Sequence, residues 1–395
     1  MRGVIRATSA ALLLMAARAQ ADVADTTLGR YLPLYPGLYL DLRDAHDPRD
    51  RVFDAGGDER DTATPSLAGH SSFPLHEVAA RFTWTFPLFE SQGVPLLSSR
   101  LHTARATLRY ARVRARGRLA DYVGSRDDLT DDGSGVGDTT LEFGTFLWGG
   151  SDWRSEASAP GGAGLLLLGI NVPTGVYEHE APVNAGTNHW AFHAQLGGAV
   201  RPWAGALFEA GAGYRVHLVN YEPQFGGLAP SEQGDDAWID LSLAQRLLPG
   251  LHLSVSLAER RGRANRYDDP QYAPNAPAAP PNSDTYPTPG RYADDGTSLR
   301  SAGLALHWFA TQRVLVSAGY VRPLAGRSGE FDLPFTSRSP AGCIEGAVTC
   351  TTSPGETVRV DGLGPARSYA SDHWAVSLRY NFGQGDTFTC VGCSR

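Results

Sequence analysis

The sequence predicts an all-β fold, a transmembrane antiparallel β-barrel of about twelve strands with short periplasmic turns and long extracellular loops. Three observations predict it. Segments with alternating apolar and polar residues recur along the chain, tight and long connections alternate between them, and one such segment lies close to the C-terminus. Successive side chains of a strand point to opposite faces, so this alternation gives each strand one apolar and one polar side. Outer-membrane barrels are built from a series of such strands.

The C-terminal segment 374–382 shows the alternation most clearly. Its apolar face carries Trp374, Val376, Leu378, Tyr380 and Phe382, and its polar face carries Ala375, Ser377, Arg379 and Asn381. An apolar-out, polar-in strand that ends in an aromatic residue is typical of the closing strand of a barrel.

Eleven further segments repeat the pattern. With the closing strand, the predicted strands lie near 30–45, 76–88, 99–116, 137–148, 161–174, 189–202, 204–219, 236–248, 250–262, 299–310, 312–324 and 371–382. The segment 161–174 is apolar on both faces from Leu165 to Leu168, so we expect its inner side to meet a plug or a constriction.

Short and long connections alternate along the chain. Pro202-Trp203, Pro249-Gly250 and Ala310-Thr311-Gln312 are predicted tight turns, whereas 45–75, 117–136, 175–188, 219–235, 262–298 and 325–370 are long, polar loops. Short periplasmic turns and long extracellular loops have this arrangement. Outward aromatic residues form two predicted girdles, with Trp190 and Trp374 on the long-loop side and Trp84, Trp308 and Phe382 on the short-turn side. Trp148 and Trp238 are out of phase and are expected to point inward.

The N-terminus resembles a secretory signal peptide. Arg2 and Arg6 precede a short apolar core, and Ala19-Gln20-Ala21 is a small-x-small cleavage site. We therefore predict a signal peptide over 1–21, a barrel over 22–382 and a periplasmic tail over 383–395. Cleavage would remove three arginines and no acid, which changes the formal net charge from -7 to -10.

Composition excludes other classes. No run approaches eighteen consecutive apolar residues, so a helical membrane protein is excluded. The chain is net negative and every basic residue is Arg, with no basic patch for nucleic acid. Four cysteines lie in two close pairs, Cys343 with Cys350 and Cys390 with Cys393. In an oxidising periplasm they are disulfide candidates, although Cys390-Val-Gly-Cys393 also has the spacing of a redox or metal motif.

Three short motifs then point to a family. Ser134-Gly-Val-Gly-Asp138 opens one strand, Pro173-Thr-Gly175 ends the next, and Asn184-Ala-Gly-Thr-Asn-His-Trp190 leads into a third. Together they resemble the MetA-pathway phenol-degradation family of outer-membrane β-barrel transporters, best over about 134–202. The resemblance implies a barrel that passes small apolar or aromatic compounds, and it brings no catalytic residues.

Polar positions between the outward residues give the candidate site. The predicted lumen-lining set is Arg81, Arg105, Arg109, Glu142, His193, Glu209, Arg215, Asp240 and Arg246. Charges that line a narrow barrel select what passes. The alternative is that acids and bases pair only to fill and satisfy the interior.

Three other groups of residues each allow two interpretations. Arg112, Arg114, Arg116 and Arg118 could face lipopolysaccharide phosphates or be solvated decoration. The acidic segment 127–134 offers carboxylates to a hard cation but lacks the EF-hand pattern, and we predict no metal. The Pro- and Tyr-rich segment 270–292 could cap the mouth or form a mobile outer loop.

Enzymatic activity is not expected. His252 and Ser254 share a face, as in barrel phospholipases, but they lie on the polar side beside a short turn and lack the Asn-Gly that follows in that family. The sequence therefore predicts an outer-membrane channel without cofactor for small hydrophobic or aromatic compounds. The alternative is a non-conducting structural or surface-interaction barrel that acts through its loops. Predicted partners are outer-membrane lipid, lipopolysaccharide, the barrel-assembly machinery and a small-molecule solute.

Overall fold

A computed structural model describes most of the predicted strands. The described residues are 37–54, 56–61, 70–72, 74–86, 101–118, 128–148, 162–178, 184–221, 232–267, 285–287, 292–311, 313–337, 357–361 and 368–382. No helix within these ranges has the length and apolar character needed to cross a membrane.

Several predictions fall on residues outside the described ranges. These are the signal peptide 1–21, the tail 383–395 and the four disulfide candidates Cys343, Cys350, Cys390 and Cys393. The pairing of Cys343 with Cys350 and of Cys390 with Cys393 therefore stays a prediction.

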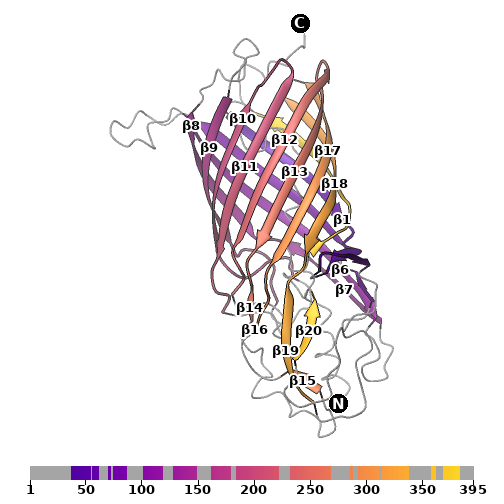
Figure 1. The fold of residues 1–395 in the computed structure, drawn as a ribbon. Helices are drawn as coiled ribbons and strands as arrows, with labels where there is room; N and C mark the ends of the chain where they lie inside the picture. Colours follow the sequence, from indigo (N-terminus) through magenta and orange to yellow (C-terminus); the bar gives the residue numbers. More distant parts are fainter. Residues whose placement is uncertain are drawn as a thin grey trace.

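Twelve long antiparallel strands form a closed barrel (Figure 1). They are β1 (Gly37–Asp47), β5 (Leu75–Phe86), β6 (His102–Arg118), β8 (Thr139–Trp148), β9 (Gly162–Val172), β10 (Ala191–Val200), β11 (Ala206–His217), β12 (Asp236–Leu248), β13 (Leu251–Gly262), β17 (Thr297–Thr311), β18 (Val314–Arg327) and β22 (His373–Asn381). Each corresponds to one predicted strand. The predicted fold is confirmed.

Two pairings complete the ring of strands, one between the first and last long strands and one between β6 and β8. β1 pairs with β22 from Tyr39–Asn381 to His46–Trp374, which confirms the last predicted strand as the closing one. β6 pairs with β8 from His102–Thr145 to Thr107–Thr140. Each of the twelve strands therefore has a partner on both sides, and a closed sheet leaves no row of unpaired backbone groups facing lipid.

The tight turns lie where the sequence predicts them. Gly205 and Gly250, which follow Pro202-Trp203 and Pro249, both have a φ of +76°. Glycine adopts this left-handed conformation without steric cost, so it suits the tight turn between two antiparallel strands. The connections 87–101 and 149–161 on the same side are longer than the tight turns.

The opposite end carries short strands within segments that the sequence predicts as loops. They are β2 (Arg51–Phe53), β3 (Glu59–Asp61), β4 (His70–Ser72), β7 (Asp128–Val136), β14 (Arg266–Tyr267), β15 (Thr285–Pro287), β16 (Tyr292–Ala293), β19 (Glu330–Ser337), β20 (Thr357–Asp361) and β21 (Ser368–Tyr369). The prediction of 117–136 as a loop is therefore wrong for β7. β6 continues past the barrel rim, and β7 pairs with this extension from Arg118–Asp128 to Tyr110–Val136.

The outer face of the barrel is an apolar belt with aromatic residues at both ends. Trp190 and Trp374 on the long-loop side, and Trp84, Trp308 and Phe382 on the short-turn side, are all exposed. These placements match the two predicted girdles.

Trp148 corrects one prediction, because it points outward. The β8–β9 register shifts between Phe146 and Trp148, and a β-bulge of this kind turns the following side chain to the other face. The indole of Trp148 lies against Gly164, which shares the outer face with Leu166 and Leu168, and Trp148 is 58% exposed. Trp238 points inward as predicted, since it lies across Gly213 on the inner wall.

Candidate functional site

The inner wall carries the predicted lumen-lining residues. Strand register places all nine on the inner face: Arg81, Arg105, Arg109, Glu142, His193, Glu209, Arg215, Asp240 and Arg246. Their role in selecting a solute stays a prediction. Five of them, Arg105, His193, Glu209, Arg215 and Asp240, are buried, so the inner wall is densely packed at their positions.

Charged side chains form a layer around the middle of the inner wall. On one side Arg379 of β22 donates to Asp41 of β1 over 2.5 Å, and both side chains are about nine-tenths buried. On the other, His193 Nε2 lies 3.0 Å from Glu142 Oε1, and Arg105 is opposite Glu142 in the β6–β8 register. Buried charges are costly unless they are paired, so these pairings offset the cost of placing the layer within the barrel.

Two glycines give ring side chains room on this wall. A Cβ at Gly169 would overlap the His193 ring, and a Cβ at Gly213 would overlap the Trp238 indole. Each ring therefore lies across bare backbone of the neighbouring strand. The guanidinium carbon of Arg215 is 5.5 Å from the centre of the Trp238 ring, within the range of a cation–π contact. Trp238 is only partly buried, so an aromatic surface is available on the inner wall.

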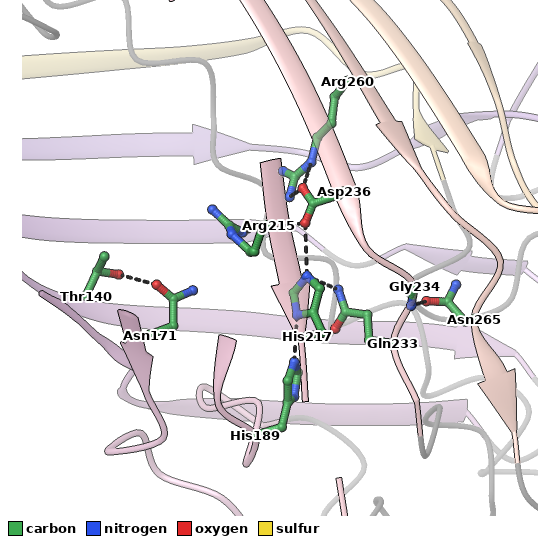
Figure 2. A network of polar contacts seen from close by, with 10 residues as sticks. All are labelled: Thr140, Asn171, His189, Arg215, His217, Gln233, Gly234, Asp236, Arg260 and Asn265. Carbon is green, nitrogen blue, oxygen red and sulfur yellow. Dashed lines mark hydrogen bonds and ion pairs between the residues drawn. The ribbon is translucent and has the colours of Figure 1, made fainter. Parts of the chain in front are cut away.

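A polar network lies at the long-loop end of the same wall (Figure 2). Asp236 at the start of β12 accepts from Arg260 of β13 at 2.6 and 2.9 Å, and Arg215 lies 3.9 Å away. His217 Nε2 is 3.0 Å from the same carboxylate, and its Nδ1 is 2.9 Å from Nε2 of His189. The network thus joins β11, β12, β13 and the segment that precedes β10.

One carboxylate brings the three sequence motifs together. Asp138, which is 1% exposed between β7 and β8, accepts from the backbone N–H of Gly175 at 3.0 Å and of Thr187 at 2.8 Å. The Thr187 hydroxyl donates to the same side chain at 2.5 Å. Gly175 and Gly186 pack so closely that a Cβ on Gly175 would lie 2.5 Å from the Gly186 Cα. The motifs therefore build one junction that holds the connections between β8, β9 and β10 together.

The short-turn end of the inner wall is apolar. A cluster of buried side chains runs around it: Leu101, Phe146, Ala163, Leu165, Leu167, Ala199, Leu207, Ala244, Phe309 and Leu315. Leu165 and Leu167 of β9 are 0% exposed, so protein atoms cover this stretch of inner wall completely. The inner side of this strand therefore meets a filled region, as its two apolar faces predict.

A family model described as "Putative MetA-pathway of phenol degradation" matches residues 56–261, which is more than half of the chain. The chain belongs to this family. The matched range contains all three motifs and the Asp138 junction that they form. Comparison with curated proteins gave no match.

A solved structure shares the fold of this MetA-pathway family member. The COG4313 outer membrane channel from Pseudomonas putida F1 is similar with a TM-score of 0.58 and 14% identity, over 91% of this chain and 100% of that one. The NanC porin (TM-score 0.36, 6% identity, 87% and 100% covered) and a FadL homologue of Pseudomonas aeruginosa (0.34, 9%, 88% and 90%) are more distant. These likenesses concern the barrel architecture alone.

The Ser–His arrangement in this family member differs from the one considered in the sequence. Ser254 is 2.8 Å from His307 Nε2, and Ser317 is 2.9 Å from His307 Nδ1, so the partner of Ser254 is His307 and not His252. All three side chains are on the inner wall and at least 95% buried. His307 was missed because its partners come from β13 and β18, which pairing and not sequence spacing brings beside it.

Other inner-wall residues were missed although the sequence holds a signal for them. Asp41 lies between the outward Leu40 and Leu42, Asp236 has the parity of the inward Trp238 on β12, and Arg260 has that of the inward Ser254 on β13. Their alternation marks them as inward. Their partners could not be found from the sequence, because these depend on strand register.

The remaining candidates in this family member stay predictions. Arg112 and Arg114 have the parity of the outward Leu108 and Tyr110 on β6, and their contact with lipopolysaccharide stays a prediction. Within the described ranges no group of three or more His, Cys, Asp or Glu could hold a metal ion. Segment 268–284 of the Pro-rich loop lies outside those ranges.

Proposed function

We propose that the protein is a channel of the Gram-negative outer membrane that passes small hydrophobic or aromatic compounds passively, and that it is not an enzyme. A cleaved signal peptide, the barrel-assembly machinery and contact with lipopolysaccharide at the outer leaflet belong to the same proposal. The closed barrel, its apolar belt and its two aromatic girdles support a position in a bilayer. The P. putida protein of similar fold is an outer membrane channel, and the family is named for phenol degradation.

The partly exposed indole of Trp238 is the observation that carries the solute class. It lies on an inner wall that is otherwise charged at this level, with Arg215 beside it and Gly213 beneath it. An aromatic compound can stack on an indole, and such contacts are worth roughly 0.5–1.5 kcal/mol beyond area burial.

A second candidate is a non-conducting structural or surface-interaction barrel. The complete burial of Leu165 and Leu167 favours it, because a filled stretch of inner wall offers no path at that point. The short strands beyond the outer rim would then supply the interaction surface (Figure 1).

Flux into liposomes separates the two candidates. We expect liposomes that contain the purified protein to take up a small phenolic compound faster than empty liposomes. Folding is checked by the heat-modifiable gel mobility of an intact barrel. A folded barrel that gives no flux above empty liposomes would support the second candidate.

Trp238→Ala tests the solute class directly. We expect it to slow the uptake of an aromatic compound several-fold and to leave an aliphatic compound of equal size unaffected. Trp308→Ala is the matched control, because it removes an indole that is 54% exposed on the outer face. Equal effects of the two substitutions would contradict a role for Trp238 in solute passage.

A further inference from the structure

Two imidazoles meet at the outer mouth of the barrel (Figure 2). Nε2 of His189 lies 2.9 Å from Nδ1 of His217, and the ring centres are 5.1 Å apart. His189 precedes β10 and is 7% exposed, and the side chain of His217 at the end of β11 is 3% exposed. Both rings lie on the inner side of the wall.

The outer nitrogen of each ring faces an acceptor. Nδ1 of His189 is 3.0 Å from the carbonyl oxygen of Thr187, which can only accept, so this nitrogen carries a hydrogen. Nε2 of His217 is 3.0 Å from Asp236 Oδ2. Arg260 donates to that carboxylate twice, which keeps it ionised, so Nε2 of His217 also carries a hydrogen.

The three contacts of the two rings need one more N–H hydrogen than a pair of neutral imidazoles carries. A neutral imidazole has one N–H, and the two outer contacts use both of them. A neutral pair would therefore oppose two lone pairs across 2.9 Å, whereas one additional proton turns this contact into an N–H···N hydrogen bond. We propose that His189 and His217 bind one proton between them, and that this shared proton is an acid-operated latch between the segment 184–190, which leads into β10, and the end of β11.

The charges around the pair set the direction of the switch. Asp236 of β12 favours the added proton, whereas Arg215 of β11 and Arg260 of β13 oppose it. Gln233 before β12 is neutral and lies 3.5 Å from His217, and Asp138 from the β7–β8 connection acts on the loop through Thr187. Burial of the rings disfavours the added charge, and two cations against one nearby carboxylate add to this effect, so the proton is taken up on the acid side of the pH range in which histidines titrate.

Loss of the proton must break one of the three contacts. His217 is held in the β10–β11 ladder opposite Ala191, so His189, which lies outside the ladder, is the ring that turns. The latch does not release the whole loop, because Thr187 remains bound to Asp138 and Asn220 remains 3.4 Å from the Thr187 carbonyl. The neutral state therefore differs from the acid state in a local opening at the mouth.

The test uses the full-length barrel in detergent micelles and needs no transport, so it is independent of the proposed channel function. Imidazole nitrogens are followed by ¹⁵N NMR between pH 5 and pH 8. We expect the His189 and His217 resonances to titrate together with the uptake of one proton. Independent titrations of the two rings would overturn the proposal.

A double-mutant cycle adds a second measurement. His189→Gln and His217→Gln are expected to couple by about tenfold in the unfolding equilibrium at pH 5.5 and not at pH 8. His252→Gln, an inner-wall histidine outside the network, should couple to neither. Coupling that is equal at both pH values would overturn the shared proton. So would stabilisation at pH 8 by Zn²⁺ that a chelator reverses, because the occupant would then be a metal ion.

Discussion

At the scale of single residues, the inner wall depends on charges that are buried together with their partners. Asp41 and Arg379 come from the two ends of the chain and meet only where β1 pairs with β22. Removing one partner of a buried pair leaves the other charge uncompensated, which costs more than the pair itself contributes. A wrong register of the closing strand would separate the two charges, so this pair disfavours such registers.

Arg379→Ala tests this at the site of closure. We expect it to lower the free energy of unfolding by about 3 kcal/mol, because the Asp41 carboxylate is left buried without its guanidinium. Denaturant unfolding followed by tryptophan fluorescence measures the change. Arg300→Ala is the control, since its pair with Glu259 at 3.1 Å is exposed and should contribute far less to the free energy of unfolding. Equal losses in the two variants would contradict the role of burial.

At the scale of elements, connections and not strands carry the family motifs. Asp138 holds Gly175 and Thr187, so the β7–β8 connection fixes the loop that leads from β9 to β10. The same loop presents His189 to His217. One buried carboxylate, in a connection and not in a strand, therefore positions the segment that carries His189 at the mouth.

Asp138→Ala should loosen this junction without opening the barrel. Hydrogen bonds to a charged group contribute about 1.5–3 kcal/mol each, and the substitution removes three of them. We expect cleavage within 173–190 by a protease to become at least several-fold faster, while heat-modifiable mobility is retained. Glu232→Ala is the matched control, because its exposed pair with Arg266 lies at the same rim. Unchanged cleavage in Asp138→Ala would show that the loop is held by other contacts.

At the scale of the whole molecule, closure of the barrel is complete before the chain ends. β22 pairs with β1 up to Asn381 and with β18 up to Tyr380, and the backbone N–H of Phe382 donates to the Leu38 carbonyl at 2.9 Å. All of these contacts use residues up to 382.

Truncation separates the closing strand from the tail. Removal of 383–395 is expected to leave a heat-modifiable barrel in the outer membrane. Removal of 382–395 should reduce the assembled fraction several-fold, because the exposed terminal aromatic of the closing strand is lost. Cell fractionation with gel mobility measures both. Failure of the shorter truncation to assemble would assign the tail a role in folding.

The sequence determined the strands, because the alternation of apolar and polar residues can be read along a single strand without knowing which strands pair with it. The order of the twelve strands, the closing role of Trp374 to Phe382 and the inward parity of Glu142, His193 and Trp238 all follow from this pattern. Trp148 shows its limit, since a single bulge reverses the parity of every side chain that follows it.

Only the tertiary structure decided which side chains meet. Asp41 and Arg379, like Ser254 and His307, are brought together by strand register, and a shift of one residue would place each pair on opposite faces. His189 meets His217 through the segment that leads into β10. The short outer strands were hidden for a related reason: β7 exists because β6 extends beyond the rim to pair with it. Alternation fixes the face of a residue, whereas its neighbour across the ladder depends on how the whole barrel closes.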